Sequence, residues 1–600
     1  MRAWREDARP VVGGMRRTAV AELWLLLGAG VVLLGLGLGL RDPWPADEPR
    51  FALIARDMVR SGEWLFPRVA GEWYSDKPPL FMWLAAIFYA LTGELRVAFL
   101  LPSLLAGLGM VALVHDLARR LWDRRVALAA GLLLLLSVQF TLQARSAQLD
   151  ALVALWTTLG LYGLLRHLLL GPDWRWYTAG GFAMGLGVVT KGVGFLPLFV
   201  LLPWLWLRWW RPGALPPVDG SWRMWLLAPA ALLVPVACWL LPMAATVWAS
   251  GDPALEAYRD DLLFRQTVTR YADTWTHLRP AWYYLVHVIP WAWLPTTLAL
   301  PWLLTAWRRR LVRGDARYWL LLGWVVCVLL FFSLSPGKRG VYLLPALPAF
   351  VLAAAPLLSG GLLRRRGLRV AAAVVGGVLA VIACGIGVVL SIAAWSALDW
   401  DPLGIGARLA RQGFVLWGVA ALAGVSGLTG MLLTAWGVAR RREPVALALW
   451  LAVSWLALGA LGYPAINDAR SARDLMAAVA VRVPAGHPLA MIGWKEQLVL
   501  QLPRPAVHFG FRRAAETELR DAAAWLRGTP DGWVLAPASQ LAPCFEPVQA
   551  QPVMRRHRKD WVLVDARALT GRCAGEGDSR AARRYVPALG RNATAGDSLK

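Results

Sequence analysis

The chain has 600 residues, of which 58% are hydrophobic, and its mean hydropathy is +0.48. These values exclude a soluble multidomain enzyme and are typical of a polytopic membrane protein. The formal net charge is +25, and the basic residues lie in short loops between apolar segments. That placement indicates the positive-inside rule, with affinity for anionic lipid as a second interpretation, and it argues against nucleic-acid binding.

Apolar runs of about 17 to 25 residues predict membrane-spanning helices. Such runs occur at 19–40, 97–118, 126–143, 151–168, 177–190, 192–209, 224–249, 281–306, 317–333, 340–359, 369–396, 413–437 and 445–463. The sequence thus predicts a polytopic α-helical membrane protein with about 13 transmembrane helices. A shorter apolar run at 79–92 is expected to lie on the outer face as an interfacial helix, because only then do all basic loops face the cytoplasm. The N-terminus is then a cytoplasmic, retained signal anchor.

The segment from 464 to 600 changes character and predicts a small α/β domain after a transmembrane domain at 1–463. Three β-like runs, at 489–494, 532–538 and 560–566, stand among helix-like stretches at 467–482 and 512–527. The last 15 or so residues have the composition of a disordered tail. Cys544 and Cys573 lie in this segment, and they could form a disulfide if it faces an oxidising compartment.

Six groups of polar residues fall on the predicted outer face. They are Asp47–Glu48, the stretch "YSDKPP" with Tyr74, Asp76 and Lys77, Asp150, Lys191, the stretch 265–284 with Arg270 and His277, and the stretch 333–348 with Lys338 and Tyr342. A charged residue at bilayer depth costs about 2.5 to 3.5 kcal/mol on insertion scales, so such residues persist where they are paired, hydrated or functional.

A structural role is open for each of these groups as well. Asp47 and Asp150 both stand where a helix N-cap is expected. Lys77 could be an interfacial lysine whose ammonium reaches water, and Lys191, Lys338 and His277 could serve packing or local structure alone.

Lysines and an arginine beside carboxylates at a membrane edge suggest a lipid-linked phosphate as the ligand. A carboxylate could act as general base on an acceptor hydroxyl, and cations would stabilise the departing phosphate. The sequence has no Walker motif and no Rossmann fingerprint, which argues against a nucleotide as energy source.

Five ordered segments resemble the GT-C class of polyprenyl-phosphate-sugar glycosyltransferases. The most specific is "DEPRFALIARDMVRSGEWLFPRVAGEWYSDKPPLFMWL" (47–84), followed by "RSAQLDALVALW", "TKGVGF", "RYADTWTHLRPAWYY" and "SPGKRGVYLLPALP". Within this class the chain looks most like the bacterial branch containing 4-amino-4-deoxy-L-arabinose transferase of lipid A, related to protein O-mannosyltransferases of glycosyltransferase family 39. The resemblance implies an inverting transferase with a periplasmic site and a sugar donor carried on undecaprenyl phosphate.

The resemblance also implies roles for particular residues. It implies catalytic or acceptor-orienting carboxylates at Asp47 and Asp150. It implies donor-phosphate binding by Lys77, Arg270 and Tyr342, and we add Lys338 and Lys191 as further cations of the same face. The predicted substrate-lining residues are Glu48, Tyr74, Asp76 and His277.

The chain departs from the family where some members carry a Glu-His pair implied in metal binding. This region reads "FRQTVTRY" here, so a divalent metal is doubtful, and Asp76 with His277 is only a weak substitute.

The leading hypothesis is a bacterial inner-membrane glycosyltransferase that moves a sugar from undecaprenyl phosphate to a periplasmic acceptor, with lipid A favoured. The expected partners are this donor, the envelope acceptor and membrane lipids, and the protein is expected to be a monomer. The alternatives are a protein or glycan O-mannosyltransferase-like enzyme, a lipid-sugar transporter and an inactive envelope-binding relative. A transporter would be expected to have broken helices and charges at the bilayer midplane.

Overall fold

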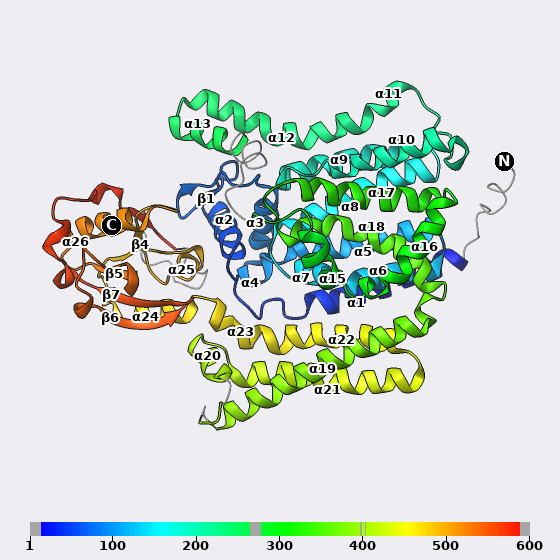
Figure 1. Cartoon of the computed structure of the whole chain (residues 1–600). Coiled ribbons are helices and arrows are strands. Elements are labelled where there is room, and N and C mark those ends of the chain that lie inside the picture. The colour runs from blue at the N-terminus through cyan, green and yellow to red at the C-terminus, as the bar shows by residue number, and fades with distance from the viewer. Residues whose placement is uncertain (1–13, 264–277, 397–398, 402–403, 588–600) are drawn as a thin grey trace. The chain divides into compact units, whose positions relative to one another are not determined.

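The computed structural model describes residues 14–263, 278–396, 399–401 and 404–587. Within these ranges the chain is mainly helical, and it divides into two compact units (Figure 1). The first unit contains Met1–Leu36, Pro102–Leu379 and Thr429–Leu456, and the second contains Gly37–Leu101, Ala380–Leu428 and Ala457–Lys600.

The first unit is a bundle of helices, several of them long and apolar. Its main helices are α1 (Gly14–Gly35), α5 (Leu101–Leu121), α6 (Arg124–Leu136), α7 (Val138–Ala144), α8 (Leu149–Leu169), α9 (Trp174–Lys191), α10 (Leu201–Trp210), α11 (Trp222–Trp225), α12 (Leu227–Ser250), α13 (Pro253–Asp260), α15 (Ile289–Ala292), α16 (Leu300–Val312), α17 (Ala316–Leu334), α18 (Leu347–Ser359) and α22 (Glu443–Ala457). Helices α19 (Arg366–Trp395) and α21 (Leu416–Arg440) contribute to both units.

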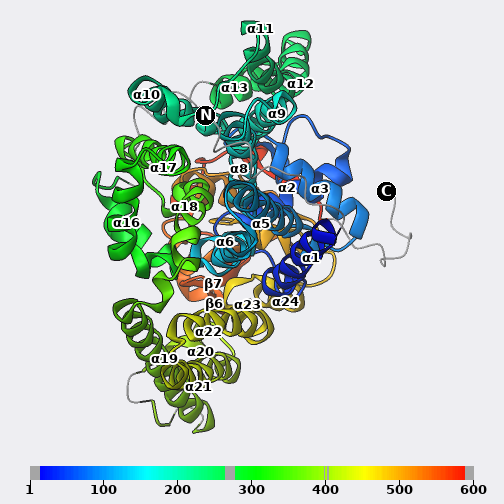
Figure 2. The same ribbon diagram turned by 90° about the vertical axis from the view of Figure 1, so that its right-hand side faces the viewer.

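Small residues allow helices α8, α9 and α12 to approach one another closely. Helix α9 packs along both α8 and α12, and α17 packs beside α18, as Figure 2 shows. A Cβ atom added at Gly163 of α8 would lie 2.2 Å from the carbonyl oxygen of Trp176 in α9. One added at Gly181 of α9 would lie 2.2 Å from the carbonyl oxygen of Ala228 in α12. These contacts are the small-residue packing that membrane helices use.

Eight helices in the described part of the chain are long and apolar enough to cross a membrane, or up to ten if each of two bent pairs is one span. Shorter apolar helices lie at Val20–Gly35, Leu80–Thr92 and Leu196–Trp210. Helical segments occupy each of the predicted spans, so the polytopic helical class is confirmed. The count of 13 and the interfacial position of 79–92 stay predictions.

The second unit contains a six-stranded mixed sheet and residues 37–101, which we call the first loop. The first loop holds α2 (Glu48–Ser61), β1 (Arg68–Val69), β2 (Glu72–Trp73), α3 (Leu80–Thr92) and α4 (Leu95–Ala98). Helix α2 begins with Pro49 in its first turn and ends at Gly62, whose φ of +74° forms the C-cap. Its apolar face, with Phe51, Ile54 and Met58, is buried.

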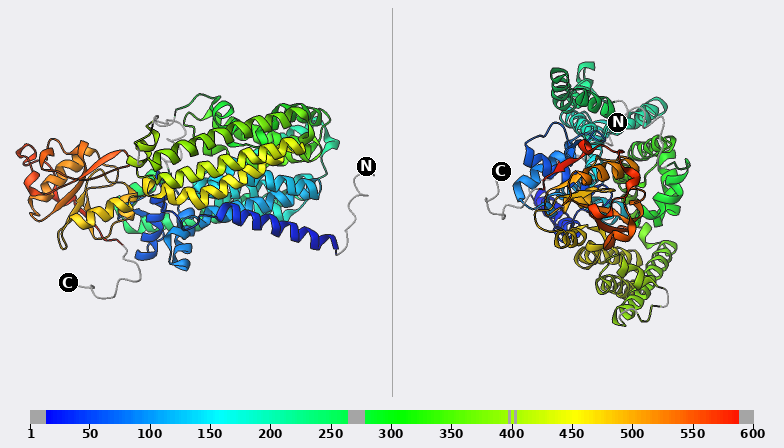
Figure 3. Two further views of the ribbon diagram at one scale, coloured as in Figure 1. Left: turned by 90° about the horizontal axis from the view of Figure 1, so that it is seen from below. Right: turned by 90° about the vertical axis from the view of Figure 1, so that its left-hand side faces the viewer.

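The strands of the sheet are β3 (Leu489–Met491), β4 (Ala506–His508), β5 (Trp533–Pro537), β6 (Gln551–Arg556), β7 (Lys559–Val564) and β8 (Arg583–Tyr585), in the order β6-β7-β5-β3-β4-β8. Both views of Figure 3 show them in orange and red. The pairs β3–β4 and β3–β5 are parallel, and the others are antiparallel. Helix α26 (Ala515–Arg527) connects β4 to β5, and its buried face packs in the sheet's core.

Short helices complete this unit, namely α20 (Ile405–Arg411), α23 (Tyr463–Arg470), α24 (Arg473–Arg482) and α25 (Glu496–Leu500). The three β-like runs of the sequence are strands, but β4, β6 and β8 were not predicted, because they are short or rich in Arg and Pro. The separation of 464–600 as a periplasmic domain stays a prediction, and the proposed disordered tail lies outside the described residues.

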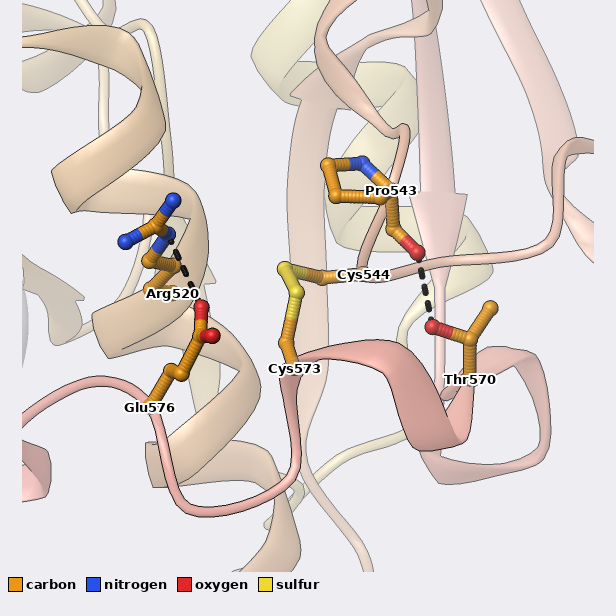
Figure 4. Close-up of a disulfide and its surroundings, with 6 residues drawn as sticks. All are labelled: Arg520, Pro543, Cys544, Thr570, Cys573 and Glu576. Carbon is orange, nitrogen blue, oxygen red and sulfur yellow. Dashed lines mark hydrogen bonds and ion pairs between the residues drawn. A yellow bond between two sulfur atoms is a disulfide. The ribbon is translucent and has the colours of Figure 1, made fainter.

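Cys544 and Cys573 form a disulfide with their Cα atoms 5.3 Å apart (Figure 4). Nearby, the Thr570 hydroxyl donates to the carbonyl oxygen of Pro543 at 2.7 Å, and Arg520 pairs with Glu576 at 3.3 Å. Both cysteines are buried in the core that packs against the sheet. The disulfide therefore links the segment after β7 covalently to the segment before β6.

Candidate active site

The turn between α9 and the next helix places Lys191. Lys191 is the last residue of α9, and Gly192 caps the helix with a φ of +83°. The chain then folds back so closely that a Cβ atom added at Gly194 would lie 2.1 Å from the carbonyl oxygen of Met184. Glycine is therefore required at this turn, which fixes the lysine at the helix end.

Lys191, Asp150 and Tyr342 come together in the first unit from three separate segments. The Lys191 ammonium nitrogen lies 2.5 Å from Oδ1 of Asp150 and 4.6 Å from the centre of the Tyr342 ring. Asp150 is 8% exposed. It lies in the first turn of α8, whose N-cap is Gln148, so Asp150 is not the predicted N-cap.

The segment before Tyr342 is anchored through its backbone. Lys338 is 4% exposed, and its ammonium donates to the carbonyl oxygens of Ser335 at 2.5 Å and Arg279 at 3.0 Å. The side-chain amide of Gln139 donates to the carbonyl oxygen of Gly340 at 2.8 Å. These bonds give Lys338 a structural function at this bend of the chain.

The second unit holds Asp47 beside Arg50. Asp47 occupies the N-cap position of α2, but its side chain makes no capping hydrogen bond. Its Oδ1 lies 3.8 Å from an Arg50 guanidinium nitrogen. Arg50 in turn pairs with Glu496 at 2.6 Å, and its guanidinium carbon lies 5.8 Å from the centre of the Tyr74 ring.

Burial and neighbouring charges shift the pKa values of Tyr74 and Arg50. Tyr74 is 2% exposed, and burial, with the nearby charge of Asp76, raises the pKa of its hydroxyl. For Arg50, burial acts to lower the pKa, but Glu496 and Tyr74 outweigh it and the pKa is raised. Arg50 is therefore a fixed cation, and Tyr74 stays protonated as a hydrogen-bonding hydroxyl.

Glu48 is held within the protein. Its two carboxylate oxygens accept from Arg41 at 2.5 and 2.8 Å, and one also accepts from the backbone N–H of Trp44 at 2.8 Å. The side chains of Arg41 and Glu48 are 2% and 7% exposed. This geometry favours a structural role for Glu48 over the predicted substrate-lining role.

Asp76 pairs with Arg512 at 2.7 Å, and the next residue, Lys77, is half-buried in the loop before α3. The predicted residues Arg270 and His277 lie outside the described residues. Within the described ranges, no group of three or more His, Cys, Asp or Glu side chains is placed to hold a metal. The weakly predicted metal site of Asp76 and His277 stays a prediction, because His277 lies outside these ranges.

Sequence reasoning missed three charged partners of the site, namely Arg50, Glu496 and Arg512. Arg50 stands in "DEPR" and could have been found by its spacing of three residues from Asp47 on a helix. Glu496 and Arg512 are more than 400 residues from their partners along the chain, and no local pattern signals such pairs.

The chain was compared with protein-family models and with known proteins. Residues 76–244 match the family model described as dolichyl-phosphate-mannose-protein mannosyltransferase. An undecaprenyl phosphate-alpha-4-amino-4-deoxy-L-arabinose arabinosyl transferase from Pseudomonas fluorescens is 36% identical over 338 residues, which cover 54% of this chain and 57% of the relative. The one from Sodalis glossinidius is 32% identical over 334 residues, covering 53% and 56%. The chain thus matches a little over half the length of these relatives.

Among solved structures, ArnT from Cupriavidus metallidurans bound to undecaprenyl phosphate superposes with a TM-score of 0.68 at 22% identity. The match covers 92% of this chain and 100% of that one. The same protein in the apo state gives a TM-score of 0.65. The chain therefore has the fold of ArnT, and its resemblance to the GT-C glycosyltransferases, in particular to the aminoarabinose transferases, is confirmed.

Proposed function

We propose that the protein is an inverting glycosyltransferase of the bacterial inner membrane, which moves 4-amino-4-deoxy-L-arabinose from undecaprenyl phosphate to lipid A on the periplasmic face. The observation that carries the proposal is the cluster of Lys191, Asp150 and Tyr342, found in a chain similar to aminoarabinose transferases. It supplies a fixed, partly dehydrated cation at a helix end, which suits a lipid phosphate.

The proposed reaction exchanges one bond for another at the anomeric carbon. An acceptor oxygen attacks this carbon from the face opposite the donor phosphate, and the bond to the phosphate oxygen breaks. The bonding electron pair leaves on undecaprenyl phosphate, which gains negative charge. A cation aimed at that oxygen stabilises the transition state more than the ground state.

Lys191 is assigned to the departing phosphate. An ammonium carries three N–H donors, and Asp150 accepts one of them, so the group keeps donors for a phosphate. Asp150 acts in this proposal by orienting Lys191. Lys77, Arg270 and Tyr342 keep the donor-phosphate-binding roles that the family resemblance implies, whereas the bonding of Lys338 assigns it to the support of this region.

Asp47 is proposed to act on the acceptor. A phosphate acceptor is already anionic at neutral pH and needs little help from a base, so Asp47 would position it or the sugar. A hydroxyl acceptor would need the carboxylate as general base. Asp47 is 25% exposed at its side chain, which leaves it accessible to a substrate.

The proposed topology places the N-terminus in the cytoplasm and the site in the periplasm, with 13 spans in 1–463 and a periplasmic domain at 464–600. The basic loops support this orientation. The Cys544–Cys573 disulfide supports an oxidising compartment for residues 464–600. The protein is proposed to act as a monomer and without a metal.

A protein or glycan O-mannosyltransferase-like activity is the second candidate, favoured by the mannosyltransferase family model that matches 76–244. It would use the same class of lipid-linked donor with a hydroxyl acceptor.

Mass spectrometry of lipid A from cells with and without the protein tests the proposal. We expect an added aminoarabinose mass that disappears on deletion and returns with the wild-type chain, but not with the Lys191→Met variant. An unchanged lipid A profile, under conditions that induce the modification, would remove lipid A as the acceptor. Labelled sugar on periplasmic protein instead would support the second candidate.

A further inference from the structure

A cavity of about 480 Å³ in the second unit is lined mainly by arginines. It lies among α20, the end of α23 and the hairpin of β6 and β7, which are labelled in Figure 1. The arginines that line it are Arg408, Arg411, Arg470, Arg555, Arg556 and Arg558. No function described so far uses them.

Most of this charge has no ion-pair partner among the described residues. Arg556 pairs with Asp474, and Arg555 lies 3.9 Å from Asp560 where both side chains are more than 60% exposed. For the other four arginines, the described residues provide no ion pair. Gathered cations repel one another and raise the local concentration of anions, so the cavity is suited to a multiply charged anion.

The turn of the hairpin supports a binding role. His557 and Arg558 connect β6 to β7 with φ angles of +51° and +65°, a conformation that such hairpin turns usually give to Asn and Gly. A histidine and an arginine adopt it only under strain, and strain of this kind tends to persist at functional positions. The turn is therefore less stable than one built from Asn and Gly, and it places the side chains of His557 and Arg558 at the cavity.

His557 also has an unused polar atom. Its Nε2 lies 3.0 Å from the carbonyl oxygen of Arg470, and its Nδ1 is buried without a hydrogen-bond partner among the described residues. Because Nε2 bonds to a carbonyl oxygen, it is the protonated nitrogen in the neutral ring. Burial lowers the pKa of His557, so a donor at Nδ1 would form only where the charge of a bound anion offsets this burial.

We propose that this cavity binds a phosphate group of the phosphorylated glycolipid that accepts the sugar. Guanidinium groups bind phosphate through paired N–H bonds. Pro45 lines the cavity, and Asp47 follows two residues later, within about 7 Å along the backbone. A headgroup with two phosphates would thus be anchored by one of them here, with its sugar extending toward the start of α2.

The inference rests on the proposed acceptor class, and a direct binding experiment separates it from transfer activity. The full-length protein is placed in phosphatidylcholine nanodiscs and titrated with lipid A carrying both phosphates, with the dephosphorylated glycolipid, with phosphatidylglycerol and with inorganic phosphate. We expect the triple variant Arg408→Gln, Arg470→Gln, Arg558→Gln to weaken binding of bisphosphorylated lipid A at least tenfold. Binding of the dephosphorylated glycolipid should not change.

The matched control is Arg527→Gln, an exposed arginine of α26 outside the cavity, which should bind like the wild type. In transfer assays the triple variant should raise the KM for lipid A at least tenfold, while kcat and the KM for the donor stay within about twofold. A triple variant with three lysines should restore a large part of the affinity, because it restores the charge.

Two results would overturn the proposal. One is wild-type affinity of the triple variant for bisphosphorylated lipid A. The other is equal binding of phosphatidylglycerol or inorganic phosphate, which would make the cavity a general anion site. If the protein transferred no sugar to lipid A, the proposed function would fail, and the titration would still decide the binding site. If the triple variant did not fold, the single variants Arg470→Gln and Arg558→Gln would be titrated instead.

Discussion

The ammonium nitrogen of Lys191 lies 2.5 Å from a carboxylate oxygen of Asp150, although 41 residues of chain separate the two. The pair joins the last residue of α9 to the first turn of α8, and the ring of Tyr342 lies 4.6 Å from the same nitrogen. The lysine is thus held in one position by a carboxylate and an aromatic ring. This pre-organisation is what electrostatic stabilisation of a leaving phosphate requires.

Replacing Lys191 with methionine should lower kcat for sugar transfer by about 10² or more, because removal of one such electrostatic contact costs about 10² to 10³ in rate. Lys191→Arg should keep part of the activity, since it keeps the charge. Single-turnover rates with the lipid-linked donor measure the effect. The control is Arg309→Gln, at an exposed position near the end of α16. A rate for Lys191→Met within threefold of the wild type would contradict the assigned role.

Asp47→Asn separates two roles of this carboxylate. We expect a fall in kcat of more than about 100-fold if Asp47 is a general base, since such groups contribute about 10² to 10⁴. A fall of about tenfold, with a higher acceptor KM, would indicate positioning. The exposed Glu63, just past the end of α2, provides the control Glu63→Gln. Near-normal activity of Asp47→Asn would remove Asp47 from the site.

Glu48→Gln should act on stability and not on substrate binding. The change leaves the buried Arg41 guanidinium without its counter-charge, which costs roughly 3 kcal/mol in free energy of unfolding for a buried pair. Thermal unfolding in detergent should show a lower Tm. The folded fraction should keep wild-type KM values for donor and acceptor, and a selective rise in either KM would restore the substrate-lining role.

Asp57 should make stability depend on pH. Burial raises its pKa from 3.8 to about 6, despite the Tyr585 hydroxyl that donates to it and the nearby Arg56. Between pH 3.8 and 6 the folded state therefore binds the proton more tightly than the unfolded state, and the contribution of Asp57 to stability falls as the pH rises through this window. Asp57→Asn should raise the free energy of unfolding by about 3 kcal/mol at pH 7 and by much less near pH 4.

Comparing Tm values of the variant and the wild type from pH 4 to pH 8 checks this expectation. The Tm difference between Asp57→Asn and the wild type at each pH isolates the effect of Asp57. The Tm of either protein alone also contains the effect of His508, whose contribution to stability changes with pH in the opposite direction. Burial lowers the pKa of His508 to about 4, so its contribution is lost as the pH falls from 6.5 toward 4. A stabilisation by Asp57→Asn that was larger at pH 4 than at pH 7 would refute the assignment.

The disulfide should contribute about 3 to 4 kcal/mol to the stability of the sheet region, given the sequence separation of 29 between its cysteines. The double change Cys544→Ser, Cys573→Ser should therefore lower the Tm, and a reductant should lower the Tm of the wild type but not of this variant. Cys238→Ser changes an exposed free cysteine in α12 and serves as the control. Equal Tm values with and without reductant would show that the disulfide does not stabilise the protein.

The sequence identified the class of the fold and most residues of the candidate site. Long apolar runs specify helices wherever they occur, because the bilayer leaves no other way to satisfy the backbone. The resemblance of five ordered segments implied Asp47, Asp150 and Tyr342 as site residues, and the predicted outer-face position of Lys191 added it as a further cation. Edge strands such as β6 were missed because their pairing depends on neighbours and not on their own composition.

The partners of individual charges were decided only by the tertiary structure. Asp47 and Glu48 are adjacent in sequence, yet Glu48 is locked to Arg41 while Asp47 makes no capping hydrogen bond and lies 3.8 Å from Arg50. The arginine cavity gathers residues from 408 to 558 and has no counterpart in any local motif. Apolar periodicity is a local property of the chain, whereas the partner of a charge depends on which distant segments the fold brings within a few ångströms.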